Sequence, residues 1–244
     1  MNVLIGADIV PTKSNEELFE NGKKEKLIGE GLSKIMDKAS YIIMNLEVPL
    51  VDKKTPIEKC GPNLIASTKS ITGLKKINPY FYTLANNHIF DQGEEGLKST
   101  CKILEVNNIS YAGVGKNLKE MRKFHIAEFG NLKLGIYCCA EHEFSIATEN
   151  SMGANPFDIL YAFDDVKGLK EKCDKVIVLY HGGKEHYRYP SPNLRRIFCK
   201  FAEVGADYII AQHTHCIGCM EEYNGAYLIY GQENFLFDNS NNEY

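Results

Sequence analysis

Short apolar runs alternate with longer polar segments along most of the chain. Five of these runs are short and rich in β-branched or aromatic residues, which is typical of buried strands. They cover residues 2–7, 41–45, 80–84, 175–180 and 207–211. The alternation predicts strands separated by helices, as in an α/β protein.

Helical periodicity marks two of the intervening segments. Leu97, Cys101 and Leu104 recur at helical spacing, and apolar residues recur in the same way over residues 194–201. Ser191 precedes Pro192 at the start of the second segment, which predicts a helix cap followed by the first helical residue. Both stripes are interpreted as core-facing surfaces that give no information about function.

Two hairpins interrupt the rhythm of strands and helices. Apolar runs flank Gly130-Asn131 and Asn224-Gly225, and such dipeptides favour two-residue turns between antiparallel strands. The paired runs are 124–129 with 132–138, and 220–223 with 226–230. We therefore expect an α/β fold in layers, with two packed mixed β-sheets flanked by helices. Without a repeat or a linker, residues 1–244 are predicted to form a single domain.

Composition narrows the class of protein. Lys and Arg total 28 and Asp and Glu total 32, which gives a formal charge of −4 over 244 residues and argues against nucleic acid as the partner. A small anionic ligand would need a local source of positive charge. The chain lacks an apolar run of about 18 residues, so no membrane span is expected. Its first residues lack the features of a signal peptide, and we expect a cytoplasmic protein with reduced cysteines.

Polar side chains follow five of the predicted strands. Asp8 follows the first strand, while the others are Asn45, Glu47, Asn86, Asn87, His88, His181, His213 and His215. Because the carboxyl ends of strands in an open α/β sheet line one edge, these groups are expected to gather at one place. His213 and His215 would point in similar directions if the backbone stayed extended.

This mixture of ligand types favours particular ions. Carboxylate and amide oxygens combined with imidazole nitrogens suit Mn, Fe or Zn. Six of these residues are candidate metal ligands, which is more than one tetrahedral zinc ion would use. Two divalent metal ions are therefore expected. Such a pair would supply the positive charge that the composition lacks.

The order of these motifs resembles the CapA family, the bacterial capsule or poly-γ-glutamate synthesis proteins. That family is a branch of the calcineurin-like metallophosphoesterases. The resemblance runs from Asp8 to about Phe237. It is carried by Asn45-Leu46-Glu47, Ala85-Asn86-Asn87-His88-Ile89-Phe90-Asp91-Gln92-Gly93, His181-Gly182-Gly183-Lys184-Glu185, Gly205-Ala206-Asp207 and Gln212-His213-Thr214-His215.

The resemblance implies roles for individual residues. The metal ligands would be Asp8, Glu47, Asn87, His181, His213 and His215, with Glu47 in the bridging position. His88 would be the catalytic histidine, assisted by Asp91. Contacts with the substrate would come from Asn45, Asn86 and Glu185. The implied fold is a layered metallophosphoesterase-like sandwich.

The sequence departs from the superfamily pattern in three places. Ile9 and Val10 follow Asp8 where the superfamily has Asp-x-His, so one histidine ligand is missing and single-ion occupancy is an alternative. Gln212 replaces the glycine of the late Gly-His-x-His motif. Residues 239–244 end the chain where relatives usually continue, so the domain is expected to be minimal or truncated at the C-terminus.

Two segments have a second interpretation. Asp91 with Glu94 forms a capping-box pattern, so Asp91 is expected to cap the following helix or to contact the site directly. Residues 141–143, Glu-His-Glu, either line the pocket or form a solvated loop.

The predicted function is metal-dependent hydrolysis of a phosphoester-like substrate in capsule or poly-γ-glutamate biosynthesis. A metal-bound hydroxide would attack phosphorus and His88 would protonate the leaving oxygen. The substrate would be small and anionic or derived from the polymer. The alternatives are a metal-dependent enzyme acting on a peptide or γ-glutamyl substrate and a non-catalytic metal-binding accessory protein of polymer synthesis.

Overall fold

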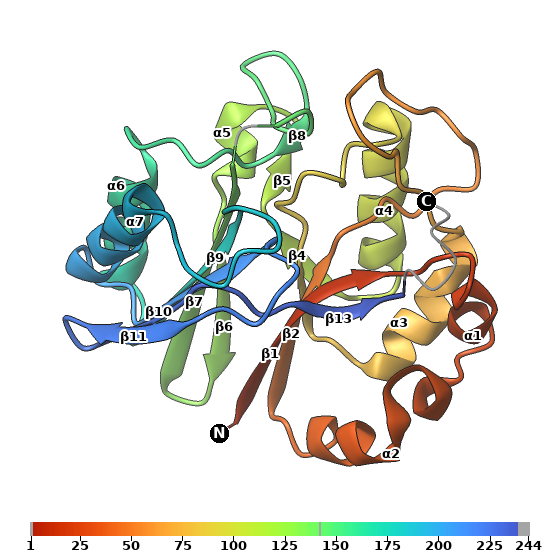
Figure 1. Ribbon diagram of the computed structural model, residues 1–244, viewed down its shortest axis with the longest axis horizontal. Coiled ribbons are helices and arrows are strands. Elements are labelled where there is room, and N and C mark those ends of the chain that lie inside the picture. The colour runs from red at the N-terminus through yellow and green to blue at the C-terminus, as the bar shows by residue number, and fades with distance from the viewer. Residues whose placement is uncertain (1, 142, 239–244) are drawn as a thin grey trace. The chain divides into compact units, whose positions relative to one another are not determined.

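The computed structural model describes residues 2–141 and 143–238 and divides the chain into two compact units. Unit 1 comprises Met1–Thr83, His88–Tyr111 and Asn234–Tyr244, and unit 2 comprises Leu84–Asn87 and Ala112–Glu233. Each unit is built around its own main sheet (Figure 1). The predicted truncation at residues 239–244 lies outside the described residues.

The sheet of unit 1 has five strands in the order β13-β1-β2-β3-β4. Its strands are β1 (Val3–Val10), β2 (Tyr41–Leu46), β3 (Phe81–Thr83), β4 (Ser110–Ala112, of which Ala112 belongs to unit 2) and β13 (Asn234–Phe237). β1 pairs in parallel with β13 and β2, and β2 pairs in parallel with β3. Every residue of β2 is buried, as expected for a parallel strand that is covered on both faces.

The helices of unit 1 connect these parallel strands. They are α1 (Glu16–Glu20), α2 (Lys24–Met36), the 3₁₀ turn η1 (Thr68–Ser70), α3 (Ile71–Ile77) and α4 (Gly93–Val106). α1 and α3 approach closely at Gly73, where an added Cβ would lie 2.6 Å from the Cα of Phe19. On α4 the predicted stripe is confirmed at Leu97 and Leu104, which are buried, while Cys101 is half-buried.

Unit 2 contains a mixed six-stranded sheet in the order β11-β12-β10-β9-β7-β6. Its strands are β6 (His125–Phe129), β7 (Leu132–Ala140), β9 (Lys175–His181), β10 (Tyr208–Gln212), β11 (Met220–Tyr223) and β12 (Ala226–Ile229). β5 (Val114–Gly115) and β8 (Gly153–Ala154) form a separate antiparallel pair. Both predicted hairpins are confirmed as the antiparallel pairs β6–β7 and β11–β12.

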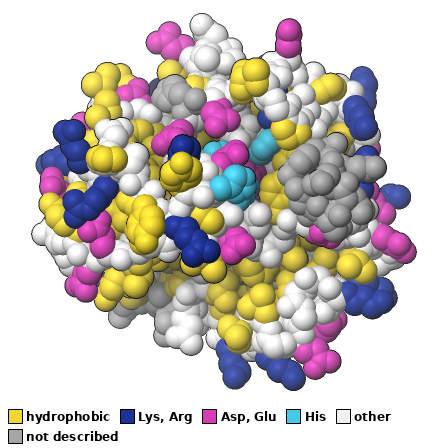
Figure 2. Space-filling model, in the orientation of Figure 1, with side chains coloured by type: hydrophobic (Ala, Val, Ile, Leu, Met, Phe, Trp, Pro, Cys, Tyr) yellow, Lys and Arg dark blue, Asp and Glu magenta, His cyan; other side chains and the backbone are white. Residues whose placement is uncertain are grey.

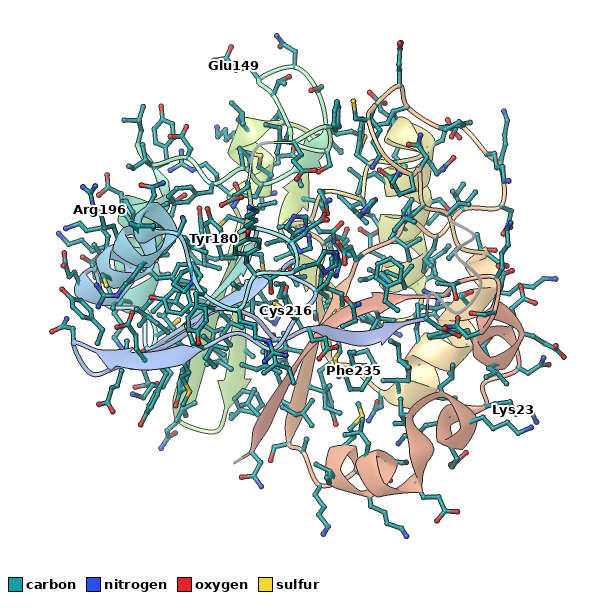
Figure 3. The ribbon with its side chains drawn as sticks, viewed as in Figure 1. Lys23, Glu149, Tyr180, Arg196, Cys216 and Phe235 are labelled. Atoms are coloured by element: carbon teal, nitrogen blue, oxygen red, sulfur yellow. The ribbon has the colours of Figure 1, made fainter. Side chains whose placement is uncertain are left out.

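Two helices pack on one face of this sheet. α6 (Ala162–Lys170) and α7 (Pro192–Glu203) contact β9 and β10 respectively, and α5 (Leu118–Met121) lies beside β5 (Figure 1). Tyr180 of β9 belongs to the core beneath these helices, whereas Arg196 of α7 points outward (Figure 3). Ser191 caps α7 by accepting a hydrogen bond from the Leu194 N–H at 3.1 Å, which confirms the predicted helix start.

Side chains alternate between the two faces of β9. Val178 and Tyr180 pack into the core beneath α6 and α7. Because successive residues of a strand point to opposite faces, His181 at the end of β9 belongs to the other face. Ala140 and Gln212 are its neighbours in the parallel register. The strand therefore delivers an imidazole to the face that the two helices leave uncovered.

The predicted fold class, α/β with several sheets and flanking helices, is confirmed. The five strands expected between helices are observed within three residues of the expected bounds. Exposed acidic and basic side chains are interspersed on the face shown in Figure 2, in keeping with the small net charge. Among the described residues, none of the helices has the length and the apolar character needed to cross a membrane.

Candidate metal centre

The end of β1 and the end of β2 place three polar side chains in the interior of unit 1. Asp8, Asn45 and Glu47 are all fully buried. Asp8 and Asn45 are partners in the parallel register, and Asn45 Nδ2 donates a hydrogen bond to Asp8 Oδ1 at 2.8 Å. The Glu47 N–H donates to the Ile9 carbonyl at 3.1 Å, which extends the pairing beyond the strand. Unit 1 therefore holds two buried carboxyl groups and one amide at the carboxyl ends of adjacent strands.

Asp91 contacts the predicted catalytic histidine directly. His88 Nδ1 lies 2.6 Å from Asp91 Oδ2, and the Leu64 N–H donates to the same oxygen at 2.6 Å. The capping-box prediction is wrong, because Gln92 is the N-cap residue of α4 and no side-chain cap bond forms. The Asp91 carboxylate is already occupied by donors from His88 and from the preceding loop. Asp91 therefore orients the imidazole of His88.

Lys59 is a member of this group that was not expected from the sequence. Its Nζ forms an ion pair with Asp91 Oδ1 and lies 3.3 Å from His88 Nδ1. Only 4% of the Lys59 side chain is exposed. Lys59 lies in a loop without regular structure and far from His88 in the sequence, so local patterns carried no signal for it.

The imidazole of His181 meets an amide in unit 2. His181 Nε2 lies 2.9 Å from Asn87 Oδ1, and both residues are buried. The neighbouring Asn86 is also buried, and its carbonyl accepts a hydrogen bond from Ser145 Oγ at 2.7 Å. The segment that follows β3 and the end of β9 thus bring an amide oxygen and an imidazole nitrogen together.

The loop after β10 carries the two remaining histidines. Their φ angles are +83° for His213 and +49° for His215, so both residues are in the left-handed region. The extended backbone on which the similar directions of the two side chains depended is therefore not observed. Side-chain contacts, rather than strand alternation, gather the rings: His213 lies 4.9 Å from His181 and 5.8 Å from His215 between ring centroids. Non-glycine residues in this region concentrate at functional sites.

Two carboxylates lie near the buried ring of His213. Glu185 Oε1 lies 3.8 Å and Glu143 Oε1 lies 4.0 Å from His213 Nε2. Both glutamate side chains are substantially exposed, so their negative charges lie beside the His213 ring and are themselves not buried. Glu185, expected to contact substrate, is therefore a neighbour of a predicted metal ligand.

Glu141 holds the turn that follows His181. Its two carboxylate oxygens accept hydrogen bonds from Tyr180 Oη at 3.0 Å and from the Gly183 N–H at 3.1 Å. Gly183 has a φ of +104°, a conformation that favours glycine. Of the two interpretations of residues 141–143, contact with the site is observed for Glu141 and Glu143, and His142 lies outside the described residues.

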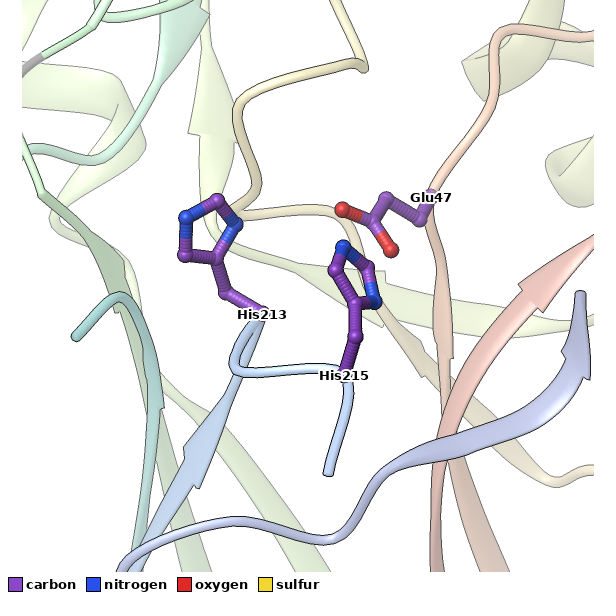
Figure 4. A group of neighbouring side chains, drawn as sticks. All are labelled: Glu47, His213 and His215. Atoms are coloured by element: carbon purple, nitrogen blue, oxygen red, sulfur yellow. The ribbon is translucent and has the colours of Figure 1, made fainter. Parts of the chain in front are cut away.

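The residues present fit a divalent cation in chemical terms. Taken by itself, unit 1 contains buried carboxylates, and unit 2 contains imidazoles with an amide oxygen 2.9 Å from one of them. Carboxylate, amide and imidazole ligands are the set that suits Mn, Fe or Zn. Figure 4 shows Glu47, which follows β2, and the side chains of His213 and His215, which follow β10.

Comparison with solved structures defines the fold as metallophosphoesterase-like. A novel phosphatase from Mycoplasma pneumoniae aligns with a TM-score of 0.55 and 17% identity over 94% of this chain and 70% of that one. A 5'-nucleotidase precursor from Thermus thermophilus aligns with a TM-score of 0.55 and 12% identity over 95% of this chain and 48% of that one. At such low identities the likeness concerns the fold alone.

The chain belongs to the bacterial capsule synthesis protein family PGA_cap, whose model matches residues 3–239. The capsule biosynthesis protein CapA of Bacillus anthracis is 27% identical over 85% of this chain and 53% of its own length. The PGA biosynthesis protein CapA of Bacillus subtilis (strain 168) is 27% identical over 95% of this chain and 62% of its own length. The chain thus spans between half and two thirds of these curated relatives.

Proposed function

We propose that this chain is a metal-dependent hydrolase of phosphoesters in capsule or poly-γ-glutamate biosynthesis. The observation that carries the proposal is the buried pair of Asn87 Oδ1 and His181 Nε2, 2.9 Å apart, with the His213 ring beside it. The metallophosphoesterase-like fold and the membership of the capsule synthesis family support the reaction class and the biological setting.

In this proposal the ligands of divalent cations are the side chains that the family resemblance implies, namely Asp8, Glu47, Asn87, His181, His213 and His215. A pair of bound cations polarises a phosphoryl group and lowers the pKa of a bound water. One cation instead of two is the alternative, because Val10 stands where the superfamily has a histidine ligand.

The proposed division of labour follows from the chemistry of the side chains. Asn45 holds the Asp8 carboxylate in place through its 2.8 Å hydrogen bond. His88 protonates the leaving oxygen through Nε2, because Nδ1 faces Asp91 at 2.6 Å. Asn86 and Glu185 complete the surroundings of a small anionic substrate or of a fragment of the polymer.

The metal content of protein purified without chelators is the first test. We expect bound Mn, Fe or Zn in the parent protein and a large loss in His181→Ala and in Glu47→Gln. The matched control is His125→Ala on β6, which lies outside the proposed centre and should keep the full metal content. Unchanged metal content in both ligand variants would refute the centre.

Turnover is the second test. We expect hydrolysis of 4-nitrophenyl phosphate or bis(4-nitrophenyl) phosphate by the metal-loaded protein, and loss of that activity in His88→Ala with metal content retained. Cleavage of γ-glutamyl peptides in place of phosphoesters would indicate the peptide-directed alternative. Metal binding without turnover, together with a His88→Ala variant that still supports polymer synthesis in cells, would indicate the accessory role.

A further inference from the structure

Unit 2 contains a cavity that the proposed reaction does not use. Its volume is about 800 Å³, and residues of α5, α6 and β7 line it. Sites for small molecules measure about 300–1,000 Å³. Tyr137 of β7 lines this cavity and belongs to the core beneath α6 and α7, whereas His181 belongs to the opposite face of the same sheet. The cavity is therefore separated from His181 by the sheet.

Arg122 lines the cavity with a guanidinium that two neighbours hold in one orientation. Its Nε and Nη2 donate to Asp165 Oδ2 at 2.8 Å and to Asp165 Oδ1 at 2.6 Å. Its Cζ lies 4.4 Å from the centroid of the Tyr161 ring, which also lines the cavity. The side chain of Arg122 is 34% exposed, so a ligand can reach it.

The second edge of this guanidinium remains available. A guanidinium has five N–H donors, and the pair with Asp165 uses two of them. Among the described residues, Asp165 is the only hydrogen-bond acceptor for Arg122. The edge formed by Nη1 and the second hydrogen of Nη2 has the fork geometry that binds a carboxylate through two parallel hydrogen bonds. Arg122 is therefore a carboxylate receptor whose orientation is set before any ligand binds.

The charged side chains that line the cavity balance one another. They are Lys119, Arg122 and Lys123 on the basic side and Glu149, Asp158 and Asp165 on the acidic side. Because Arg122 pairs with Asp165, two ammonium groups and two carboxylates remain, and within the described part of the chain these four groups form no ion pair. Asp158 accepts only from the Leu160 N–H, at 2.8 Å. A simple anion would meet the two carboxylates, and a simple cation would meet the lysines. The cavity thus suits a ligand that carries both signs of charge.

We propose that this cavity binds a short peptide with a free amino group and two carboxylates. Arg122 takes one carboxylate, Lys119 and Lys123 attract the other, and Asp158 with Glu149 takes the amino group. The volume suits a dipeptide or tripeptide better than a single amino acid. Apolar groups in the lining, such as Leu118, cover the aliphatic parts of the peptide. The proposal goes beyond the proposed hydrolase and does not depend on it.

Isothermal titration calorimetry with L-alanyl-L-glutamate tests the role of Arg122. We expect saturable binding to the parent protein and an affinity at least about 10-fold lower for Arg122→Met, because a hydrogen-bonded charge pair is lost. Arg122→Lys should also bind more weakly, because an ammonium lacks the planar fork. It retains a charge beside Asp165, so it serves as the test where the Met variant does not fold. The control is Arg196→Met on the exposed surface of α7, which should bind as the parent does.

Modified peptides test the acidic side of the cavity. N-acetyl-L-alanyl-L-glutamate lacks the ammonium group, and we expect the parent to bind it about 10-fold more weakly than the free peptide. In the double variant Asp158→Asn, Glu149→Gln, acetylation should change the affinity by less than about twofold, because the partners of the ammonium are gone. The matched control, Asp164→Asn with Glu171→Gln, changes two exposed carboxylates outside the lining and should keep the full effect of acetylation.

The outcomes separate this inference from the proposed function. Absence of saturable binding at millimolar peptide, or unchanged affinity in both Arg122 variants, would overturn it. Displacement of the peptide by an equal concentration of inorganic phosphate would also overturn it, because the cavity would then be a site for simple anions. Metal content and phosphoester turnover should be the same in the Arg122 variants as in the parent. A parent protein that binds the peptide without any turnover would refute the hydrolase and support the peptide site.

Discussion

Asn45 donates a hydrogen bond to the Asp8 carboxylate across the parallel pair β1–β2, with 2.8 Å between Nδ2 and Oδ1. Replacing Asn45 with Asp would place two fully buried carboxylates against each other. We expect Asn45→Asp to lower the free energy of unfolding in EDTA by about 1–3 kcal/mol, the cost of a lost buried hydrogen bond. Added Mn²⁺ should raise the melting temperature of this variant more than that of the parent, because a bound cation offsets the repulsion.

Thermal melts with and without Mn²⁺ check this prediction. Asn193→Asp, on the exposed surface of α7, is the control and should follow the parent protein in both conditions. An equal response of Asn45→Asp and the parent to Mn²⁺ would contradict the role of Asp8 at a metal.

The backbone at His213 gives a prediction that reverses the usual ranking of alanine and glycine. With a φ of +83°, this position penalises any residue that has a Cβ. We expect His213→Gly to be more stable than His213→Ala by about 1 kcal/mol in EDTA. Urea denaturation of both variants measures the difference.

His125 is the matched site for this comparison. It lies within β6, where the backbone is extended, so His125→Ala should be more stable than His125→Gly. The same ranking of alanine and glycine at both positions would refute the strained conformation of His213.

Gly183 and Gly168 give opposite expectations for the same substitution. Gly183 has a φ of +104°, and an added Cβ would lie 3.2 Å from Thr214 Cγ2. Gly183→Ala should therefore lower stability by about 1–2 kcal/mol. Gly168 lies inside α6 with open space around the position of a Cβ, so Gly168→Ala should raise stability by about 0.5–1 kcal/mol. Paired urea denaturation curves test both signs.

Asp207 should make stability depend on pH. Burial alone would raise its pKa, but hydrogen bonds from Lys170, Lys175 and the Val176 N–H outweigh burial and hold the pKa below its ordinary value. A carboxyl group with a lowered pKa in the folded state stabilises the protein above the ordinary Asp pKa of about 3.9. This contribution is lost as the pH falls through the folded-state pKa.

The corresponding variant is Asp207→Asn. After allowance for solvent screening, it should be less stable than the parent by about 1 kcal/mol at neutral pH. The difference should shrink as the pH falls below about 4. Glu171→Gln, at an exposed position after α6, is the control and should show no such convergence. A gap between Asp207→Asn and the parent that stays constant down to pH of about 2 would contradict the prediction.

Local patterns predicted the features of the fold that depend on local physics. A short apolar run rich in β-branched residues identified β9, a period-3.6 stripe identified α7, and the dipeptide Asn224-Gly225 identified the β11–β12 hairpin. The division of the chain between two units was not predicted, because it depends on pairings between distant segments such as β1 with β13.

The candidate site shows the same limit. Residue types and their places after strands identified His181 and Asn87, which lie together. The backbone conformation at His213 was not predicted, because periodicity does not report a residue that leaves the extended region. Lys59 was missed because its significance comes only from a tertiary contact with Asp91.

The pairing of β13 with β1 has a consequence for synthesis in the cell. β1 is synthesised well before its partner at Asn234–Phe237, and most of the described chain lies between the two strands. Until β13 is made, β1 has one exposed edge of unpaired backbone groups beside Asp8, a state that favours aggregation or chaperone binding. Closure of this sheet is therefore a late event in folding, and the surroundings of Asp8 are completed only when translation of the described chain is nearly finished.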